Sequence, residues 1–402
     1  MSRSMMETLP AVPVRGSGLR IPLIRPNPPQ LSAMTDDLTE IERSGIYSNY
    51  GPVNTRLEAR LATTIFDDGA CVTVSNATLG LMLAIKQAVG WRPQGRYALM
   101  PSFTFAAAAQ AAVWCGLTPL LCDIDAETWL PDATEEAALL ARWQSEIAVI
   151  VPNATFGNCL DIDRYDRLSA QWGVPVVIDA AASLGSVDAA GHAFGSRSRH
   201  PLVFSMHATK AFATAEAGLV YCTDHKLIAA LRTMGNFGFG ENRSATMPGL
   251  NAKLSEVGAL LALRKLREIE AIAGHRNALF EMYRHLLPGF TFQRMTGQRT
   301  AHQFVSVLVP EHSDSDVAGV ISRLAQNGIG SGRYFVPHLA EQPFFREISV
   351  YGALPVTEAL SERVISLPMS DFMTRVDVEE VCDAFRLACA SPVTRHARQA
   401  RG

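Results

Sequence analysis

The segment from Gly173 to Asp179 constrains the fold of this chain more than any other stretch. It reads Gly-Val-Pro-Val-Val-Ile-Asp, and mostly small residues follow it, from Ala180 to Gly185. A continuous β-branched run bounded by glycine and small residues is typical of a parallel strand that is buried on both faces of its sheet. Ligands of such sheets bind beyond the carboxyl ends of the strands. The pattern therefore places Asp179 beside a ligand, although an aspartate here could equally cap the following helix.

Strand and helix patterns alternate along the first 250 residues. Further strand candidates are residues 71–74, 97–100 and 148–151. This alternation predicts a mostly parallel sheet covered by helices on both faces. A long helical pattern then runs from about Leu254 to His285, and residues 300–390 resume strands and helices. We therefore expect a flexible N-terminal arm (1–20), a large domain (21–250), a small C-terminal domain (251–390) and a disordered basic tail (391–402).

Lys210 is the candidate catalytic residue. Only five of the 36 lysines and arginines are lysines, so lysine does not serve here as general surface charge. Lys210 follows an apolar stretch and a small polar turn, and the next turn and strand come after it. Partial desolvation lowers the pKa of a lysine and favours the neutral amine, which can form a Schiff base with an aldehyde. Taken alone, Lys210 could instead be a structural or salt-bridged lysine.

An aldehyde cofactor with a basic ring would explain both the lysine and the aspartate. In pyridoxal phosphate enzymes, an ionised aspartate beside the ring nitrogen keeps the pyridine protonated and makes the ring an electron sink. A phosphate site is also predicted, because Asn76, Ala77 and Thr78 open the helical run at residues 79–86. Unpaired N–H groups and the macrodipole at a helix start bind anions. The hydroxyls of Thr78 and Ser205 could each add a hydrogen bond.

Two aromatic residues, Phe103 and Phe105, follow the strand predicted at residues 97–100. An aromatic side chain just past a strand end can lie over a planar ring by offset stacking. Either phenylalanine could instead belong to the core.

The order and spacing of these pieces resemble the DegT/DnrJ/StrS-type sugar aminotransferases, which are pyridoxal phosphate enzymes of fold type I, the aspartate aminotransferase fold. The resemblance runs from about Ile21 to about Ala390. It is carried by residues 48–52, 75–78, 101–105, 179–181, 204–210, 249–256, 334–338 and 361–368. It implies an α/β fold, in which a large domain holds a mostly parallel, seven-stranded sheet flanked by helices and a smaller C-terminal domain is α+β.

The resemblance also implies a function. It predicts a cytoplasmic homodimer with shared active sites that moves an amino group from an amino acid to a keto sugar. The donor is expected to be L-glutamate and the sugar to be nucleotide-linked, in polysaccharide or secondary-metabolite biosynthesis. In the family, the positions that match Lys210, Asp179 and Phe105 are the Schiff-base lysine, the partner of the pyridinium and the ring-stacking aromatic.

Further site residues follow from the same resemblance. The family positions that match Ala77, Thr78 and Ser205 bind the phosphate, and the position of Asn236 reaches across from the second subunit. The expected cofactor site also includes Asn76 and Ser183, and the candidate substrate-binding residues are Asn49, Tyr50 and His338.

The sequence departs from the family pattern at two places. The family has glutamine or histidine three residues after the aspartate, where this chain has Ala182. We expect Asn153, Ser183 or an ordered water to contact the cofactor ring oxygen instead. After the lysine loop, Ala217 replaces the first glycine of the usual Glu-Gly-Gly, a change that costs little unless the position needs a positive φ.

Global features exclude several other classes of protein. A net charge of −3 gives no reason to expect a nucleic acid partner. Seven cysteines without a Cys-x-x-Cys pair indicate buried, reduced thiols rather than a disulfide frame or a metal site. No apolar run approaches the roughly 20 residues that span a bilayer, and the first twenty residues lack the apolar core of a signal peptide.

Two alternative functions stay open at this point. One is another pyridoxal phosphate reaction, such as a dehydratase or lyase; the other is a non-catalytic, cofactor-binding sensor. The dehydratase branch of the family has histidine at the lysine position, so Lys210 argues against that branch. The intact pair of Lys210 and Asp179 argues against the sensor.

Overall fold

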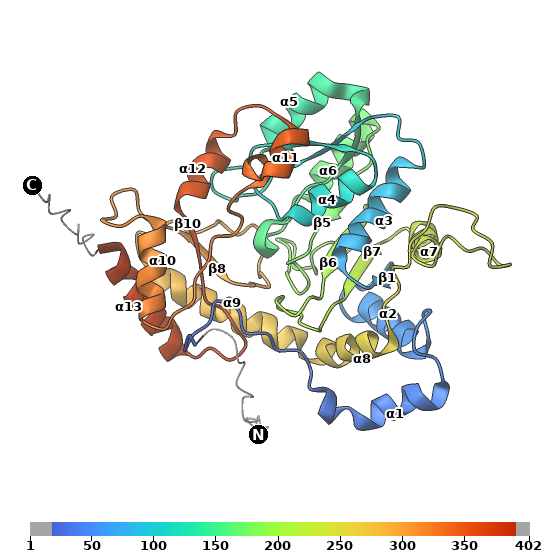
Figure 1. Ribbon diagram of the computed structural model, residues 1–402, viewed down its shortest axis with the longest axis horizontal. Helices are drawn as coiled ribbons and strands as arrows, with labels where there is room; N and C mark the ends of the chain where they lie inside the picture. Colours follow the sequence, from blue (N-terminus) through green and yellow to red (C-terminus); the bar gives the residue numbers. More distant parts are fainter. Residues whose placement is uncertain (1–17, 391–402) are drawn as a thin grey trace, which may run out of the picture.

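The computed structural model describes residues 18–390. The predicted tail (391–402) and most of the predicted arm (1–20) lie outside the described residues. A large body surrounds the central sheet, and a smaller body packs at one end of it (Figure 1). Within the described residues, no helix is long and apolar enough to cross a membrane. All seven cysteines are buried and free, which confirms the predicted buried thiols.

The bounds of the elements are as follows. The α-helices are α1 (Thr35–Ser44), α2 (Pro52–Thr64), α3 (Ala77–Val89), α4 (Ala106–Trp114), α5 (Ala133–Trp143), α6 (Ile162–Trp172), α7 (His225–Met234), α8 (Glu256–Lys265), α9 (Ile269–Leu286), α10 (Val317–Gln326), α11 (Pro343–Ile348), α12 (Pro355–Arg363) and α13 (Arg375–Ala390). The 3-10 turns are η1 (Leu31–Ala33), η2 (Gln144–Glu146), η3 (Thr155–Gly157), η4 (Leu266–Glu268) and η5 (Leu339–Glu341). The strands are β1 (Ala70–Val74), β2 (Tyr97–Pro101), β3 (Thr118–Cys122), β4 (Ile147–Ile150), β5 (Ile178–Asp179), β6 (Leu202–Ser205), β7 (Gly218–Cys222), β8 (Val305–Leu308), β9 (Val350–Tyr351) and β10 (Val364–Leu367).

The central sheet has the order β1-β7-β6-β5-β4-β2-β3, and the short strand β9 adds to its β3 edge. Parallel bridges, Ile150 to Val176 and Asn153 to Asp179, join its two halves between β4 and β5. Only β7 runs against both of its neighbours. The predicted mostly parallel, seven-stranded sheet of fold type I is therefore confirmed.

Side chains of the strands alternate between two hydrophobic cores. Leu99, Phe204 and Leu219 face one core, which includes residues of α2, α5, α6 and α8. Their chain neighbours Val203 and Val220 face the other core, with residues of α3, α4 and α7. Because both faces are covered, the strands are mostly apolar and show no regular polar alternation.

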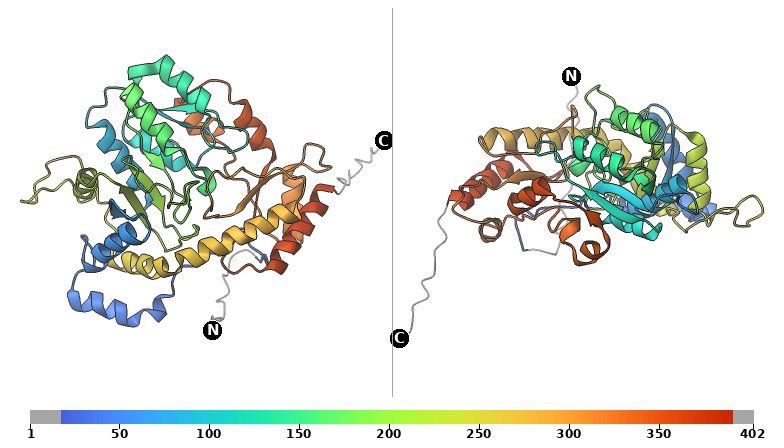
Figure 2. Two further views of the ribbon diagram at one scale, coloured as in Figure 1. Left: turned by 180° about the vertical axis from the view of Figure 1, so that it is seen from behind. Right: turned by 90° about the horizontal axis from the view of Figure 1, so that it is seen from above.

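The predicted long helix from about Leu254 to His285 is wrong in one respect, because η4 separates α8 from α9. The two helices still run in line along the molecule (Figure 2). A 3-10 turn brings residues i and i+3 to the same side of the chain. This spacing lets the ammonium of Lys265, only 1% exposed, bind the Glu268 carboxylate at 3.1 Å.

The change of hydrophobic core falls within α9 rather than between residues 250 and 251. Residues of α8 belong to a core of the large body, whereas Leu279 and Tyr283 of α9 belong to the core of the small body. Residues 339–354 also return to the large body, where β9 pairs with β3. Helix α8 follows residue 250 in the chain but packs on α2 of the large body. The division into domains at residue 250 stays a prediction.

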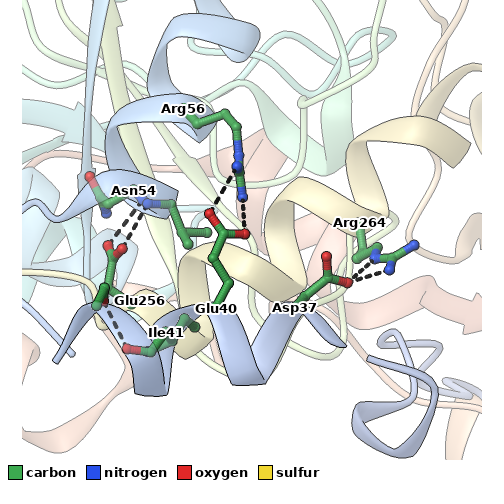
Figure 3. A network of polar contacts seen from close by, with 9 residues as sticks. Asp37, Glu40, Ile41, Asn54, Arg56, Glu256 and Arg264 are labelled. Atoms are coloured by element: carbon green, nitrogen blue, oxygen red, sulfur yellow. Dashed lines mark hydrogen bonds and ion pairs between the residues drawn. The ribbon is translucent and has the colours of Figure 1, made fainter. Parts of the chain in front are cut away.

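A polar network fixes α1 and α2 on α8 (Figure 3). The buried carboxylate of Glu256 accepts hydrogen bonds from the N–H groups of Val53 at 2.7 Å and Asn54 at 3.0 Å. It therefore satisfies two of the unpaired donors at the start of α2. By contrast, Glu40 and Arg56 pair at 3.4 Å on the exposed surface.

We predict that Glu256→Gln lowers the free energy of unfolding by about 1–3 kcal/mol, because an amide cannot accept from both buried N–H groups with the same strength. The matched change Glu40→Gln should cost no more than about 0.5 kcal/mol, because the Glu40–Arg56 pair is exposed. Thermal unfolding midpoints of the two variants, measured side by side, check this. Equal midpoints would contradict the assigned role of Glu256.

Candidate active site

A cavity of about 400 Å³ opens at the carboxyl edge of the central sheet. Seven of the residues predicted from the sequence line it: Asn76, Ala77, Thr78, Phe105, Asp179, Ser205 and Lys210. They come from the ends of β1, β5 and β6, the starts of α3 and α4, and the loop between β6 and β7. The parallel strands bring these distant segments to one edge.

The start of α3 presents free backbone donors to this cavity. The Asn76 side chain caps the helix by accepting a hydrogen bond from the Leu79 N–H at 3.0 Å. Within residues 18–390, the N–H groups of Ala77 and Thr78 have no hydrogen-bond partner. A Cβ at Gly218 would lie 2.7 Å from the Ala77 nitrogen, so only glycine lets β7 pass this close. The helix start is thus a site for an anion.

The lysine loop is a tight connection between two antiparallel strands. It leaves β6 at Ser205 and returns to β7 at Gly218, and the Met206 N–H donates to the Ala217 carbonyl at 2.9 Å. The Lys210 N–H donates to the His207 carbonyl at 2.9 Å. Ala217 does not have a positive φ, so its replacement of the family glycine carries no backbone strain.

Burial shifts the pKa values of Lys210 and Asp179 in opposite directions. Desolvation lowers the pKa of Lys210 from 10.5 to about 8, and the negative charge of Asp179 opposes part of this shift. Desolvation also raises the pKa of Asp179, against the Ala181 N–H bond and the charge of Lys210. The lowered pKa increases the share of the neutral Lys210 amine near neutral pH. A neutral amine is the nucleophilic form.

Aromatic rings form one wall of the cavity. Phe105 stands at the N-cap position of α4 and is 58% exposed, whereas Phe103 is fully buried. The two alternatives left open by the sequence are thereby resolved: Phe103 belongs to the core and Phe105 lines the cavity. The Phe335 ring lies 6.4 Å from Phe105 and 4.8 Å from Phe156, centre to centre.

The remaining predicted residues do not line this cavity. Ser183 is buried and its Oγ has no partner. His338 is buried and its Nδ1 lies 2.8 Å from the Ser102 Oγ. Asn49 and Tyr50 line a separate surface hollow of about 820 Å³, and Asn236 pairs with Asn251 beyond α7.

The residues near Ala182 show which side chain could replace the Gln or His that contacts the cofactor ring oxygen in the family. Ala182 and Asn153 both line the cavity, whereas Ser183 does not. The Asn153 Oδ1 accepts a hydrogen bond from the Thr155 hydroxyl at 3.0 Å, and its Nδ2 donates to the Asp179 carbonyl at 3.5 Å. Of the two side chains expected to replace the family residue, only Asn153 is in place.

Sequence reasoning missed several residues of the site. His207, Glu216 and Gln303 line the cavity with Lys210. The His207 Nε2 lies 3.4 Å from a Glu216 carboxylate oxygen, and the Lys210 ammonium donates to the Gln303 Oε1 at 3.0 Å. His207 and Glu216 stand close to Lys210 in the sequence and could have been found there. Gln303 gives no local signal, because 93 residues separate it from Lys210.

The residues at the cavity fit pyridoxal phosphate. Free N–H groups and the Ser205 hydroxyl suit a phosphate, Asp179 suits a pyridinium, and Lys210 suits an aldehyde. Among residues 18–390, no group of three or more His, Cys, Asp or Glu side chains could hold a metal ion.

Comparison with known proteins gives a consistent assignment. A sequence model of the DegT/DnrJ/EryC1/StrS aminotransferase family matches residues 31–386. Protein Rv3402c of Mycobacterium tuberculosis is 32% identical over 92% of this chain and 90% of its own.

Two solved structures extend the likeness to three dimensions. A Bacillus cereus protein assigned as a PLP-dependent aminotransferase is 36% identical, covering 91% of this chain and 99% of its own, with a TM-score of 0.86. DesI, solved in the presence of its TDP-sugar product, is 31% identical, covering 93% of this chain and 94% of its own, with a TM-score of 0.82.

We predict that Asp179→Asn lowers the pKa of Lys210 further, by about 1 pH unit, because the carboxylate charge that opposes desolvation is removed. The pKa is measured as the pH dependence of reductive dimethylation of Lys210, followed by mass spectrometry, in protein loaded with pyridoxamine 5'-phosphate. Lys226, on a different surface, serves as the internal control and should not change. An unaltered Lys210 pKa would mean that the Asp179 charge does not act on Lys210.

Proposed function

Because the chain belongs to the DegT/DnrJ/EryC1/StrS aminotransferase family, we propose that it transfers an amino group from L-glutamate to a nucleotide-linked keto sugar. It is a pyridoxal phosphate-dependent sugar aminotransferase. The finer proposal rests on one observation above all: Lys210, Asp179 and the free start of α3 face a single cavity. DesI was solved with a TDP-sugar product, which supports a nucleotide-linked sugar here. The cytoplasmic location stays a prediction.

Different residues of this chain would bind the phosphate, the ring and the ring nitrogen of the cofactor. Pyridoxal phosphate supplies an aldehyde that combines with amines and a ring that withdraws electrons. The N–H groups of Ala77 and Thr78, with the Ser205 hydroxyl, would bind its phosphate, and Phe105 would cover its ring. The Asp179 carboxylate would hold the proton on the ring nitrogen.

Lys210 has two proposed tasks at one atom. Its Nζ would hold the cofactor through the aldehyde, and, when it is free of the cofactor, the same Nζ would give and take a proton at the substrate. A pKa of about 8 suits this second task, because a general base works best when its pKa lies near the working pH.

The donor half of the reaction tests this proposal. We predict that adding L-glutamate converts the yellow aldehyde form of the protein to the pyridoxamine form, followed by visible absorbance. Borohydride reduction before the addition should attach the pyridoxyl group to Lys210. Lys210→Ala should slow the conversion by at least roughly 10²–10⁴-fold, as expected for loss of a general acid–base group. Labelling of Lys86, Lys226, Lys253 or Lys265 instead would contradict the assignment.

We also propose that the enzyme is a homodimer whose subunits complete each other's sites. Asn49, Tyr50 and Asn236 lie together but apart from Lys210: the Tyr50 hydroxyl donates to the Arg232 carbonyl at 3.3 Å, near the end of α7. Beyond α7, residues 236–249 extend away from the body of the molecule (Figure 1). Exposed apolar side chains surround this region: Ile46, Tyr47 and Phe237. Such a surface suits a second copy of the chain.

Mixed dimers test the shared site. We predict that Lys210→Ala and Asn236→Ala, each inactive alone, together recover about a quarter of the wild-type sites, because half of randomly formed dimers are mixed and each contains one intact site. The pair Lys210→Ala and Asp179→Asn is the matched control. Both of these residues line the same cavity of one chain, so their mixture should recover nothing. No recovery in verified mixed dimers of the first pair would mean that each chain builds its own site.

A further inference from the structure

Gln303 connects the small body of the protein to the reactive lysine. Its side chain is buried, with 8% of its surface exposed, and it lines the same cavity as Lys210. Its Oε1 accepts a hydrogen bond from the Lys210 Nζ at 3.0 Å. In the described part of the chain, this is the only hydrogen bond that Nζ makes. The position of the amine therefore depends on where Gln303 is held.

The backbone immediately before Gln303 is firmly attached. The Ala301 N–H donates to the Ser186 Oγ at 3.0 Å, and Arg276 donates through Nη1 to the His302 carbonyl at 2.8 Å. The His302 ring stacks on Phe280 at 4.0 Å. Ala301 and His302 thus each have a partner from a different segment, which fixes the backbone from which the Gln303 side chain extends.

A buried ionic network supports this attachment. Arg276, which is 3% exposed, also donates through Nε to the Asp371 Oδ1 at 2.6 Å. The Asp371 Oδ2 accepts from the Asn27 Nδ2 at 2.8 Å and lies 3.7 Å from the Lys265 Nζ. Removing one partner of such a network leaves a buried charge without compensation, which makes the arrangement costly to distort.

The chemistry of an amide suits the task of holding an amine that must exchange a proton. An amide oxygen accepts from the amine but carries no net charge. A carboxylate at the same place would bind the ammonium more strongly and would keep the lysine protonated. An apolar side chain would leave the amine without a partner. Glutamine is thus a compromise between orienting Nζ and leaving it able to lose a proton.

We propose that Gln303 is a positioning residue for Lys210. Whenever Lys210 is not linked to the cofactor, the Gln303 Oε1 holds Nζ at the place from which it gives and takes the proton. The inference rests on the proposed role of Lys210 and adds a second residue to it. It assigns to the small body a direct part in the proton transfer, through one hydrogen bond.

Three variants of the full-length protein test the proposal. Gln303→Met removes the acceptor at similar length, Gln303→Glu replaces it by a charged acceptor, and Gln298→Met is the matched control. Gln298 lies in the same segment but bonds to the Ala189 carbonyl on the outside. The readout is the pKa of Lys210 in protein loaded with pyridoxamine 5'-phosphate, measured by dimethylation and mass spectrometry, beside the pH profile of kcat.

The two changes at Gln303 should move the pKa of Lys210 in opposite directions. Loss of the acceptor destabilises the ammonium, so Gln303→Met lowers the pKa, whereas Gln303→Glu raises it by about 1–3 pH units. The ascending limb of the kcat profile should follow each pKa. We expect Gln303→Met to lower kcat by roughly 10–100-fold with a smaller change in KM, because a misplaced base affects the transition state. Gln298→Met should match the wild type.

An unchanged Lys210 pKa in both Gln303 variants would overturn the proposal. Borohydride labelling of Lys210 in the same preparations keeps this outcome distinct from failure of the proposed function. If Lys210 is labelled but its pKa does not move, only the role of Gln303 is contradicted. If Lys210 is not labelled in the wild type, the proposed roles of both residues are contradicted. If Gln303→Met does not fold, Gln303→Glu carries the test, because it keeps the length and shape of the side chain.

Discussion

Burial of the central sheet on both faces decides where this protein can do chemistry. Helices cover each face, and most of the strand side chains that point toward them are apolar. Polar groups therefore gather where the strands end, because only there can they face a cavity. Asp179 and Ser205 stand at the ends of β5 and β6, and Asn76 follows the end of β1. Because β7 runs antiparallel to β6, the loop that joins them and carries Lys210 begins and ends at this edge.

The cavity is bounded by both bodies, whose side chains share one aromatic cluster at the site. One wall belongs to the large body, whereas Gln303 and Phe304 come from the segment that leads into β8 of the small body. The buried contacts of Arg276 and Asp371 lie behind this second wall. Distances across the site therefore reflect how the two bodies are packed on one another. A substitution far from the cavity, in α9 or beside Asp371, can alter the site without touching it.

Local features of the sequence predicted the centre of the site but not its rim. Asp179, Lys210 and the start of α3 each had a structural alternative, but their order along an alternating strand and helix pattern placed all three at one edge of a parallel sheet. Ser183 does not line the cavity, since the turn from the Ala180 carbonyl to the Ser183 N–H at 2.8 Å leaves its side chain buried, so its contact with the cofactor stays a prediction. The sequence pattern does not reveal the 3-10 turn between α8 and α9, because apolar residues recur across it at helical spacing.

Other positions depend on tertiary structure that a sequence pattern does not encode. Gln303 reaches Lys210 only after the small body has packed on the large one. His338 lies beneath the site because segment 338–340 bonds to Ser102 at the end of β2. Asn49 and Tyr50 adopt positive φ angles of 66° and 57°, which few sequence signals announce for non-glycine residues.

Residues 21–27 pack against the last third of the chain in the small body, and this bears on the order of folding. Ile21 forms a bridge with Ile329, Ile24 with Met369, and Asn27 bonds to Asp371. During synthesis, the segment from Ile21 to Asn27 emerges long before its partners exist. It must stay uncommitted while the large body forms, because closing so long a loop brings no contacts until the last elements are made. Completion of the small body is therefore a late event, and the second wall of the cavity forms with it.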